Sequence, residues 1–192
     1  MPTCPVSPAD PALPHTLLCH PAQPASAVRA VTASARFGAD GELLLAYRVH
    51  GDLASLCIPA PAAPGPVDGL WQHTCLEAFV AGGDGESYRE FNFSPSGQWA
   101  AYRFAGYRAR DDAFQPPGAP RIRFAPCPDG FLLYATLAPE LLPAATALAL
   151  GLSAVIEAAD GSKSYWALAH GATQPDFHLR QGFALTLQRS IP

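Results

Sequence analysis

Alternation of apolar and polar residues with a period of two is the feature that most constrains how this chain can fold. It recurs in short runs rich in β-branched and aromatic residues, whereas no segment shows sustained apolar spacing of three and four residues. Since successive side chains of a strand point to opposite faces, these runs predict strands. We expect them at residues 15–20, 27–37, 42–50, 54–58, 72–81, 87–94, 98–103, 121–125, 131–137, 147–158, 164–169 and 183–188.

Turn residues between these runs predict antiparallel hairpins, because glycine adopts a positive φ at low cost. The turns are Asp40-Gly41, Ser96-Gly97 and Asp129-Gly130. Two proline-rich stretches, 59–66 and 115–120, lack ladder donors at their prolines and are expected to form surface loops. One helical turn is expected at 138–142, ahead of Pro143.

Length and composition favour one all-β domain. The 192 residues are 49% hydrophobic, which is enough to bury a core, and only 15% are charged, which disfavours exposed helices rich in Glu and Lys. We therefore expect an antiparallel β-sandwich with at most one or two short helical turns. It would span residues 1–192, with the proline-rich residues 1–14 as an irregular extension.

Charge and hydropathy exclude two classes of partner. The net charge is -4 and there is no run of Lys or Arg, so we expect neither nucleic acid nor an anionic membrane as a partner. No apolar run reaches the roughly 18 residues of a membrane span. The N-terminus lacks a basic region followed by an apolar stretch, so a cytoplasmic location is expected.

Two neighbouring runs share a polar face. Alternation in the first places Trp71, His73, Cys75, Glu77 and Phe79 together, and in the second Tyr88, Glu90, Asn92 and Ser94. If these strands pair, Glu77, Glu90 and Asn92 line one polar surface, with Trp71 at its edge and Arg48 as a charge partner. The residues alone also allow a solvated or arginine-paired face without a ligand.

Four blocks of sequence carry a resemblance to a known family. LWQHTCLEAFV, YREFNFSPSGQWAAYRF, SYWALAHG and PDFH are similar to successive blocks of family 9 carbohydrate-binding modules and related DOMON-like domains. That group includes stand-alone bacterial DOMON-like proteins of undetermined function. The resemblance implies a β-sandwich of the jelly-roll type that binds a small carbohydrate or a similar polar ring.

The resemblance also implies a set of binding residues. Trp71 and Trp166 would flank the sugar, because an indole face packs on the C–H side of a pyranose. Carboxylate, amide and guanidinium groups would bond its hydroxyls, and the matching residues are Glu77, Glu90, Asn92 and Arg48. His73 joins the candidates from the same face. His73 and Cys75 depart from the acidic or small polar residues usual in the family, so the identity of the sugar stays open.

We expect a domain without a cofactor, and the alternative is a domain that binds haem or calcium. DOMON-like domains can hold haem between Met and His, but Met1 is the only methionine, so a haem site would use two histidines from His73, His170 and His178. Calcium would use the loop carboxylates Asp84, Glu86, Asp111 and Asp112, which lack an ordered Asp-x-Asp spacing. Asp176 and His178 would need a third ligand to hold a metal.

Catalysis has little support in the sequence. There is no G-x-S-x-G elbow, H-E-x-x-H pair, phosphate-binding glycine-rich loop or dinucleotide fingerprint. Glu77 and Glu90 could form a glycosidase pair only at a separation that the sequence does not determine. We therefore expect a non-enzymatic protein. The remaining alternative is a structural or protein-interaction module whose tryptophans are core residues, as we expect for Trp99.

Overall fold

The computed structural model describes residues 13–83 and 85–189, so most of the expected N-terminal extension 1–14 lies outside the described residues. In this part of the chain the only helices are four 3-10 turns of three residues, and none is long and apolar enough to cross a membrane. The strands of the described residues are β1 His15–Cys19, β2 Val28–Phe37, β3 Leu43–Gly51, β4 Cys75–Gly82, β5 Tyr88–Phe93, β6 Trp99–Phe104, β7 Arg121–Cys127, β8 Gly130–Leu137, β9 Ala147–Glu157, β10 Lys163–Ala167 and β11 Leu185–Gln188. The expected nearly all-β class is confirmed.

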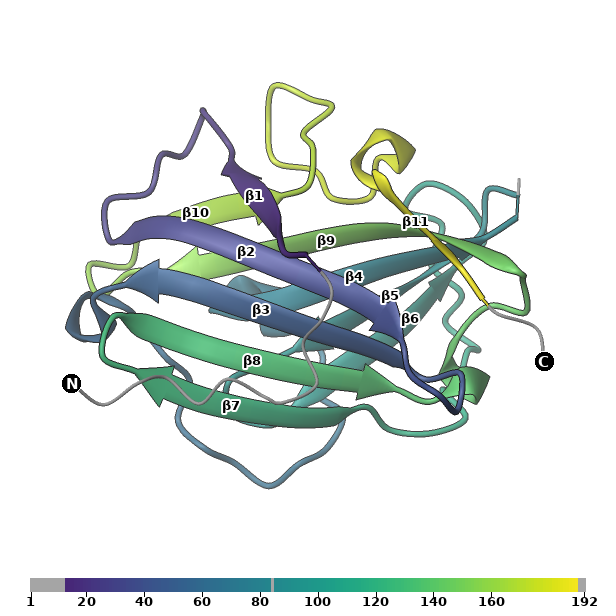
Figure 1. The fold of residues 1–192 in the computed structure, drawn as a ribbon. Coiled ribbons are helices and arrows are strands. Elements are labelled where there is room, and N and C mark those ends of the chain that lie inside the picture. The colour runs from purple at the N-terminus through teal and green to yellow at the C-terminus, as the bar shows by residue number, and fades with distance from the viewer. Residues whose placement is uncertain (1–12, 84, 190–192) are drawn as a thin grey trace.

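The strands form one curled antiparallel sheet in the order β6-β5-β4-β9-β10-β1-β2-β3-β8-β7, with β11 paired to β9. We call β2, β3, β8 and β7 the front half and β6, β5, β4, β9 and β10 the rear half. β1 joins the halves, since it pairs with β2 at one end and with β10 at the other. Figure 1 shows the two halves stacked as layers, which gives the molecule a sandwich-like shape.

The core lies between the two halves, and period-two alternation accounts for it. In β3, Leu43, Leu45, Tyr47 and Val49 are buried, while the residues between them are partly exposed. The rear half contributes alternate residues of β4 and β5, among them Leu76, Ala78, Val80, Phe91 and Phe93. Removing this apolar surface from water is the main favourable contribution to folding. Trp99 is buried too, as expected.

The three expected hairpin turns are present. Gly41, Gly97 and Gly130 have φ values of 75°, 90° and 140°, and they connect β2 to β3, β5 to β6 and β7 to β8. At Gly130 a side chain is also excluded by space, because a Cβ there would lie 1.9 Å from the carbonyl oxygen of Val49. Turn chemistry in the sequence therefore predicted the antiparallel neighbours correctly.

Two expected strands differ from the structure. The prediction of a strand at 54–58 was wrong, because the 3-10 turn η1 Leu53–Ser55 occupies the start of this segment. Asp52 caps the turn by accepting a hydrogen bond from the amide of Ala54. The strand expected at 72–81 begins at Cys75 instead, since η2 Leu70–Gln72 follows Gly69 in the left-handed conformation. The helical turn expected at 138–142 is confirmed as η3 Pro139–Leu141, and the remaining turn is η4 Arg180–Gly182.

Candidate functional site

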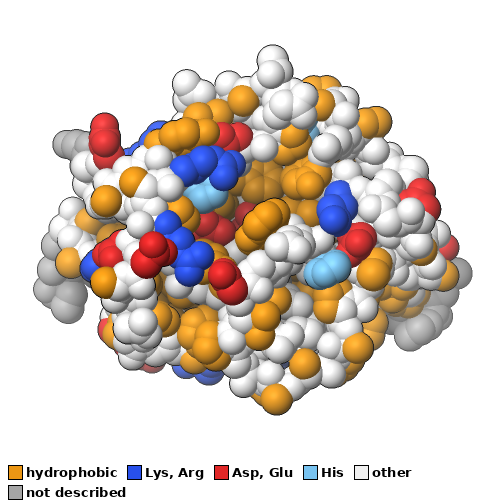
Figure 2. Space-filling model, turned by 180° about the vertical axis from the view of Figure 1, so that it is seen from behind, with side chains coloured by type: hydrophobic (Ala, Val, Ile, Leu, Met, Phe, Trp, Pro, Cys, Tyr) orange, Lys and Arg blue, Asp and Glu red, His pale blue; other side chains and the backbone are white. Residues whose placement is uncertain are grey.

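A cavity of about 550 Å³ opens on the outer face of the rear half, on the side away from the core. Figure 2 looks onto this face and shows acidic side chains inside the hollow, with arginines and hydrophobic side chains around it. Side chains of β4, β5, β6, β9 and β10 form the floor, and loop residues form the rim. The lining residues are Gln23, Asp68, Trp71, Glu77, Phe79, Glu90, Tyr102, Phe104, Arg108, Arg110, Val155, Tyr165, Gln174, Pro175, Phe177 and His178.

Strand register brings two carboxyl groups together on the floor. β4 and β5 pair antiparallel with Glu77 opposite Asn92 and Phe79 opposite Glu90. Residues opposite each other in a ladder share a face, so Glu77 and Glu90 lie diagonally across the strand pair. Both line the cavity, and they are 2% and 5% exposed. The two strands thus place two nearly buried acids at the bottom of one hollow.

Glu77 is held from below and has few polar contacts on the cavity side. The hydroxyl of Tyr47, in the front half, crosses the core and donates to the main-chain oxygen of Glu77 at 2.7 Å. On the outer face Oγ of Ser153 donates to Oε2 of Glu77 over 3.4 Å. Burial, together with the nearby charge of Glu90, raises the pKa of Glu77 well above its ordinary value.

Glu90 titrates close to neutral pH. Burial raises its pKa to about 7, even though Nδ2 of Asn92 donates to Oε1 of Glu90 at 2.9 Å and favours the charged form. Nε2 of His178 lies 3.8 Å from Oε2 of Glu90. Burial, and the nearby Arg108, lower the pKa of His178 to about 4, so this imidazole is neutral at pH 7 and brings no positive charge to Glu90.

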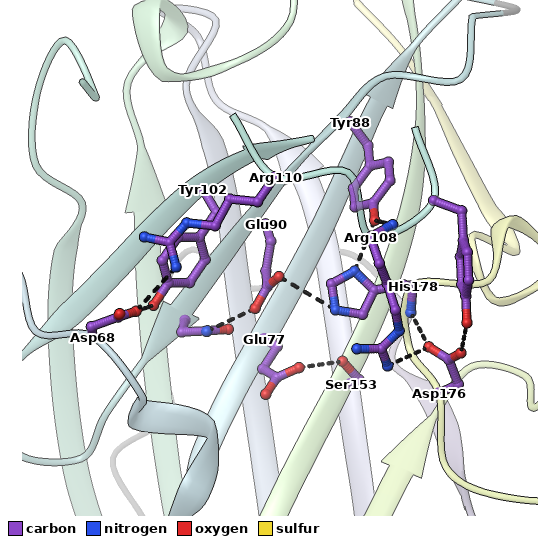
Figure 3. A network of polar contacts seen from close by, with 12 residues as sticks. Asp68, Glu77, Tyr88, Glu90, Tyr102, Arg108, Arg110, Ser153, Asp176 and His178 are labelled. Carbon is purple, nitrogen blue, oxygen red and sulfur yellow. Dashed lines mark hydrogen bonds and ion pairs between the residues drawn. The ribbon is translucent and has the colours of Figure 1, made fainter. Parts of the chain in front are cut away.

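The rim carries two arginines, and each is paired with an aspartate. Arg108 Nη2 lies 2.9 Å from Asp176 Oδ1, and Arg110 Nη1 lies 3.5 Å from Asp68 Oδ1. The hydroxyl of Tyr102 also donates to Asp68. In Figure 3 Glu77 and Glu90 lie between these two groups, with Asp68, Tyr102 and Arg110 on one side and Arg108 and Asp176 on the other.

Arg108 is held in a strained backbone conformation. Among the described residues it is the non-glycine residue with a positive φ, at 53°. The main-chain amide of Arg108 donates to the hydroxyl of Tyr88 at 3.2 Å. The same hydroxyl forms a hydrogen bond of 2.8 Å with Nδ1 of His178. Such a conformation costs on the order of 1 kcal/mol and persists where neighbouring contacts impose it. Tyr88 therefore fixes two sides of the rim at once.

Aromatic rings form much of the wall. Phe79, Tyr102, Phe104, Tyr165 and Phe177 all line the cavity. Trp71 stands at the rim on η2, and about half of its surface, 52%, is exposed. An exposed indole beside a hollow offers a free face on which a ring can stack.

The predicted binding residues divide into two sets. Trp71, Glu77 and Glu90 line the cavity together, and Asn92 lies beneath it, fully buried and bonded to Glu90. Its Oδ1 has no hydrogen-bond partner among the described residues. The structure does not bring Trp166, Arg48 or His73 to this cavity.

The expected pairing of Trp71 with Trp166 does not agree with the structure. Trp166 is 6% exposed, packs in the core and donates from Nε1 to Oγ of Ser164 at 2.9 Å. Its neighbour Tyr165 lines the cavity instead, because adjacent residues of β10 point to opposite faces. The alternation in SYWALAHG does not say which of its faces is the outer one.

Arg48 and His73 also have other partners. Arg48 is on β3 in the front half, where it pairs with Asp129 and donates to Sγ of Cys127. It is therefore not the charge partner of Glu77 and Glu90. His73 follows η2 at the edge of the rear half, and its Nδ1 lies 2.8 Å from Oε2 of Glu157.

Sequence reasoning missed several lining residues. Tyr102 and Phe104 follow from the alternation of the strand 98–103, once Trp99 is assigned to the core face. Arg108 and Arg110 lie in an irregular loop, where no periodicity predicts direction. His178 was singled out only as a metal or haem candidate, and nothing local indicates that the loop around it folds over β4 and β5.

The cofactor candidates occupy separate surroundings. Nε2 of His170 donates to the main-chain oxygen of Leu18 at 2.8 Å, and the His170 ring meets the ring of His20 edge-on. His73 contacts Glu157, and His178 contacts Tyr88 in the cavity. Asp84 lies outside the described residues, while Asp111 and Asp112 pair with Arg103 and Arg110. The described residues contain no group of three or more metal-ligating side chains.

Comparison with known proteins gives a likeness in structure only. No protein-family model matches the chain, and no curated protein matches it. A crystal structure of a candidate carbohydrate-binding protein from Bacteroides uniformis ATCC 8492 is similar, with a TM-score of 0.66 and 19% sequence identity. The likeness covers 91% of this chain and 84% of that chain. At this identity it establishes a shared, nearly all-β antiparallel fold over most of both chains.

Proposed function

We propose that this chain is a non-catalytic binding domain for a small carbohydrate or a similar polar ring. In this proposal residues 1–192 form one β-sandwich domain of the jelly-roll type, akin to DOMON-like domains and family 9 carbohydrate-binding modules. The observation that carries it is a cavity that combines exposed and partly exposed aromatic rings with the nearly buried Glu77 and Glu90. In this proposal the ligand contacts Trp71 and the other aromatic rings of the cavity, rather than the pair of Trp71 and Trp166 that the family resemblance implies.

The chemistry of the walls suits a hydroxylated ring. Trp71 is exposed and Tyr165 and Phe177 are partly exposed, so these three rings of the cavity wall can pack against the C–H side of a pyranose. A carboxyl group that is partly protonated near pH 7 both donates and accepts hydrogen bonds, which matches hydroxyl groups well. A volume of about 550 Å³ falls within the ordinary range for small-molecule sites.

The similar structure gives independent support. That protein is described as a candidate carbohydrate-binding protein, and its fold matches this chain over most of its length. A shared fold alone does not transfer a ligand, because one fold hosts many functions. The proposal therefore rests on the cavity, and the neighbour adds to it.

The non-catalytic part of the proposal rests on the sequence, which has no G-x-S-x-G elbow and no H-E-x-x-H pair. A glycosidase pair needs one group ionised and one protonated at its working pH. Burial raises the pKa of both Glu77 and Glu90, so neither is fully ionised at neutral pH. An assay for glycoside hydrolysis therefore tests this part directly.

Tryptophan fluorescence during titration with a panel of neutral and charged sugars tests the proposal. We expect saturable quenching that is lost in Trp71→Phe and kept in Trp166→Phe, the control for a tryptophan outside the cavity. Calorimetry checks that quenching reports binding. Absence of both quenching and heat across the panel would refute the proposal, and release of nitrophenol from nitrophenyl glycosides would refute its non-catalytic part.

A further inference from the structure

The charges around the cavity are unevenly compensated. At the rim the guanidinium groups of Arg108 and Arg110 are already paired with Asp176 and Asp68. Arg110 also lies 3.3 Å from Asp112 and stacks over the ring of Tyr102 at 4.4 Å. The positive charges of Arg108 and Arg110 are therefore already paired with aspartates of the protein.

The floor has no such ion pair, although Arg108 and Arg110 act on Glu90 from a greater distance and partly offset the effect of its burial. Among the described residues, neither Glu77 nor Glu90 has an arginine or lysine within ion-pair distance. The imidazole of His178, 3.8 Å from Glu90, is neutral at pH 7. A buried carboxylate without a cation is unfavourable, so an incoming positive charge would gain most at this point of the cavity.

We propose that the ligand of this cavity carries a protonated amino group, which binds between Glu77 and Glu90 while its ring packs against the aromatic wall. The ligand class is therefore a ring with an amine substituent, such as an amino sugar. This inference rests on the proposed function for the hydroxylated ring and adds the charge.

The aromatic wall supports the same ligand class. A cation near the face of a tryptophan, tyrosine or phenylalanine ring is attracted by the ring's quadrupole. Five such rings line the cavity besides Trp71, and they lie around the same floor as the two acids. An acidic ligand would instead meet two carboxyl groups at the floor and would have to displace Asp176 or Asp68 from its arginine.

Binding of a cation would change the protonation of the floor. A positive charge favours the carboxylate form, so Glu77 and Glu90 would release protons when an amine binds near pH 7. Titratable or charged groups surround Glu90 on every neighbouring element. The strands contribute Glu77 on β4, Tyr88 on β5 and Tyr102 on β6, and the loops contribute Asp68, Arg108, Arg110 and His178. Of these, Glu77 is the other group whose raised pKa makes it a source of protons.

The first experiment compares five ligands that differ in charge or in hydroxyl groups. Glucosamine carries the amine, N-acetylglucosamine and glucose are neutral, and glucuronate is acidic; cyclohexylammonium carries the charge without hydroxyls. By calorimetry at about pH 7 we expect glucosamine to bind at least about tenfold more tightly than N-acetylglucosamine, and glucuronate to bind most weakly.

The second experiment measures protons. Titration of the native protein with glucosamine in two buffers of different ionisation enthalpy should show net proton release. Affinity for cyclohexylammonium should rise about tenfold between about pH 5.5 and pH 7, as Glu90 becomes ionised. Glu90→Gln should remove much of the release and of the preference for the amine. Glu140→Gln, an exposed site on η3, should leave both unchanged.

The outcomes separate this inference from the proposed function. If neutral sugars bind as tightly as glucosamine, or glucuronate binds best, the charge inference is overturned and carbohydrate binding stands. If cyclohexylammonium binds but no sugar does, the carbohydrate proposal fails and the cation site stands. If the amine binds without proton release in the native protein, or nothing binds, the inference is overturned.

Discussion

The two faces of β4, in the rear half, are almost equally buried but differ in chemistry. On the inner face of β4, Leu76, Ala78 and Val80 pack against the front half of the sheet. On the outer face, Glu77 and Phe79 are nearly as buried, yet the groups above them belong to loops that leave a cavity of about 550 Å³.

The difference shows how one strand serves two purposes. The inner face meets a continuous sheet, and close packing there excludes polar groups that have no partner. The outer face is covered by side chains from separate loops, so space remains and two carboxyl groups are tolerated in the hollow. Solvent exposure alone would not distinguish these faces, because both have nearly none.

The largest expected effect comes from breaking the inner face. Phe93 is fully buried against the front half, so Phe93→Ala should lower the free energy of unfolding by about 3–5 kcal/mol through lost burial and a residual cavity. Urea unfolding at pH 7 measures it. A loss below about 1 kcal/mol would mean that the two halves are not packed as described.

On the outer face, Glu90→Gln is expected to stabilise the protein at neutral and higher pH. Below about pH 4 the carboxyl is protonated in both folded and unfolded chains, so the substitution should change little. As the pH rises toward 7 the unfolded chain loses the proton while the folded protein retains it, and the native protein loses stability. The substitution should therefore recover up to about 3 kcal/mol above pH 7.

Urea unfolding at a series of pH values would measure this effect, and Glu140→Gln serves as the matched control on the exposed side of η3. Some pH dependence should persist in Glu90→Gln, because Glu77 has a raised pKa as well. If native protein and Glu90→Gln have parallel stability profiles, Glu90 is not buried in the way that the structure shows.

A smaller effect is expected where the two faces are linked. Tyr47→Phe removes the hydroxyl that donates to the main-chain oxygen of Glu77 across the core. The loss of a buried hydrogen bond should cost about 1–3 kcal/mol in unfolding free energy. Tyr165→Phe is the comparison, since no described residue forms a hydrogen bond with that hydroxyl. Equal losses of unfolding free energy in Tyr47→Phe and Tyr165→Phe would contradict a stabilising hydrogen bond from Tyr47 to Glu77.

The smallest expected effect on stability is at the rim. Trp71→Ala should change the free energy of unfolding by about 0.5 kcal/mol or less, because half of the side chain is exposed, whereas Trp166→Ala should cost about 3–5 kcal/mol. Acrylamide quenching adds a direct check: fluorescence from Trp71 should be quenched readily, and fluorescence that remains in Trp71→Phe should be largely protected. Strong quenching in that variant would contradict the buried positions of Trp99 and Trp166.

Local pattern accounts for much of the fold and for part of the site. The turns at Gly41, Gly97 and Gly130 follow from dipeptides, and the shared orientation of Glu77 and Glu90 follows from the alternation of two adjacent strands. The same alternation separated Tyr165 from Trp166 but did not indicate which of them faces the core. The resemblance to a two-tryptophan site selected Trp166, whereas Tyr165 is the residue that lines the cavity.

What the sequence determined by itself is local: strand periodicity, three tight turns and the opposition of Glu77 and Glu90 to the apolar residues between them. The tertiary structure alone decided which face each strand turns to the core, and which loops cover the other. Arg108, Arg110 and His178 reach the cavity from segments outside β4 and β5, and their positions depend on pairing between strands far apart in the chain. A period of two relates a residue to its neighbours, whereas only the packed sheet relates it to the rest of the molecule.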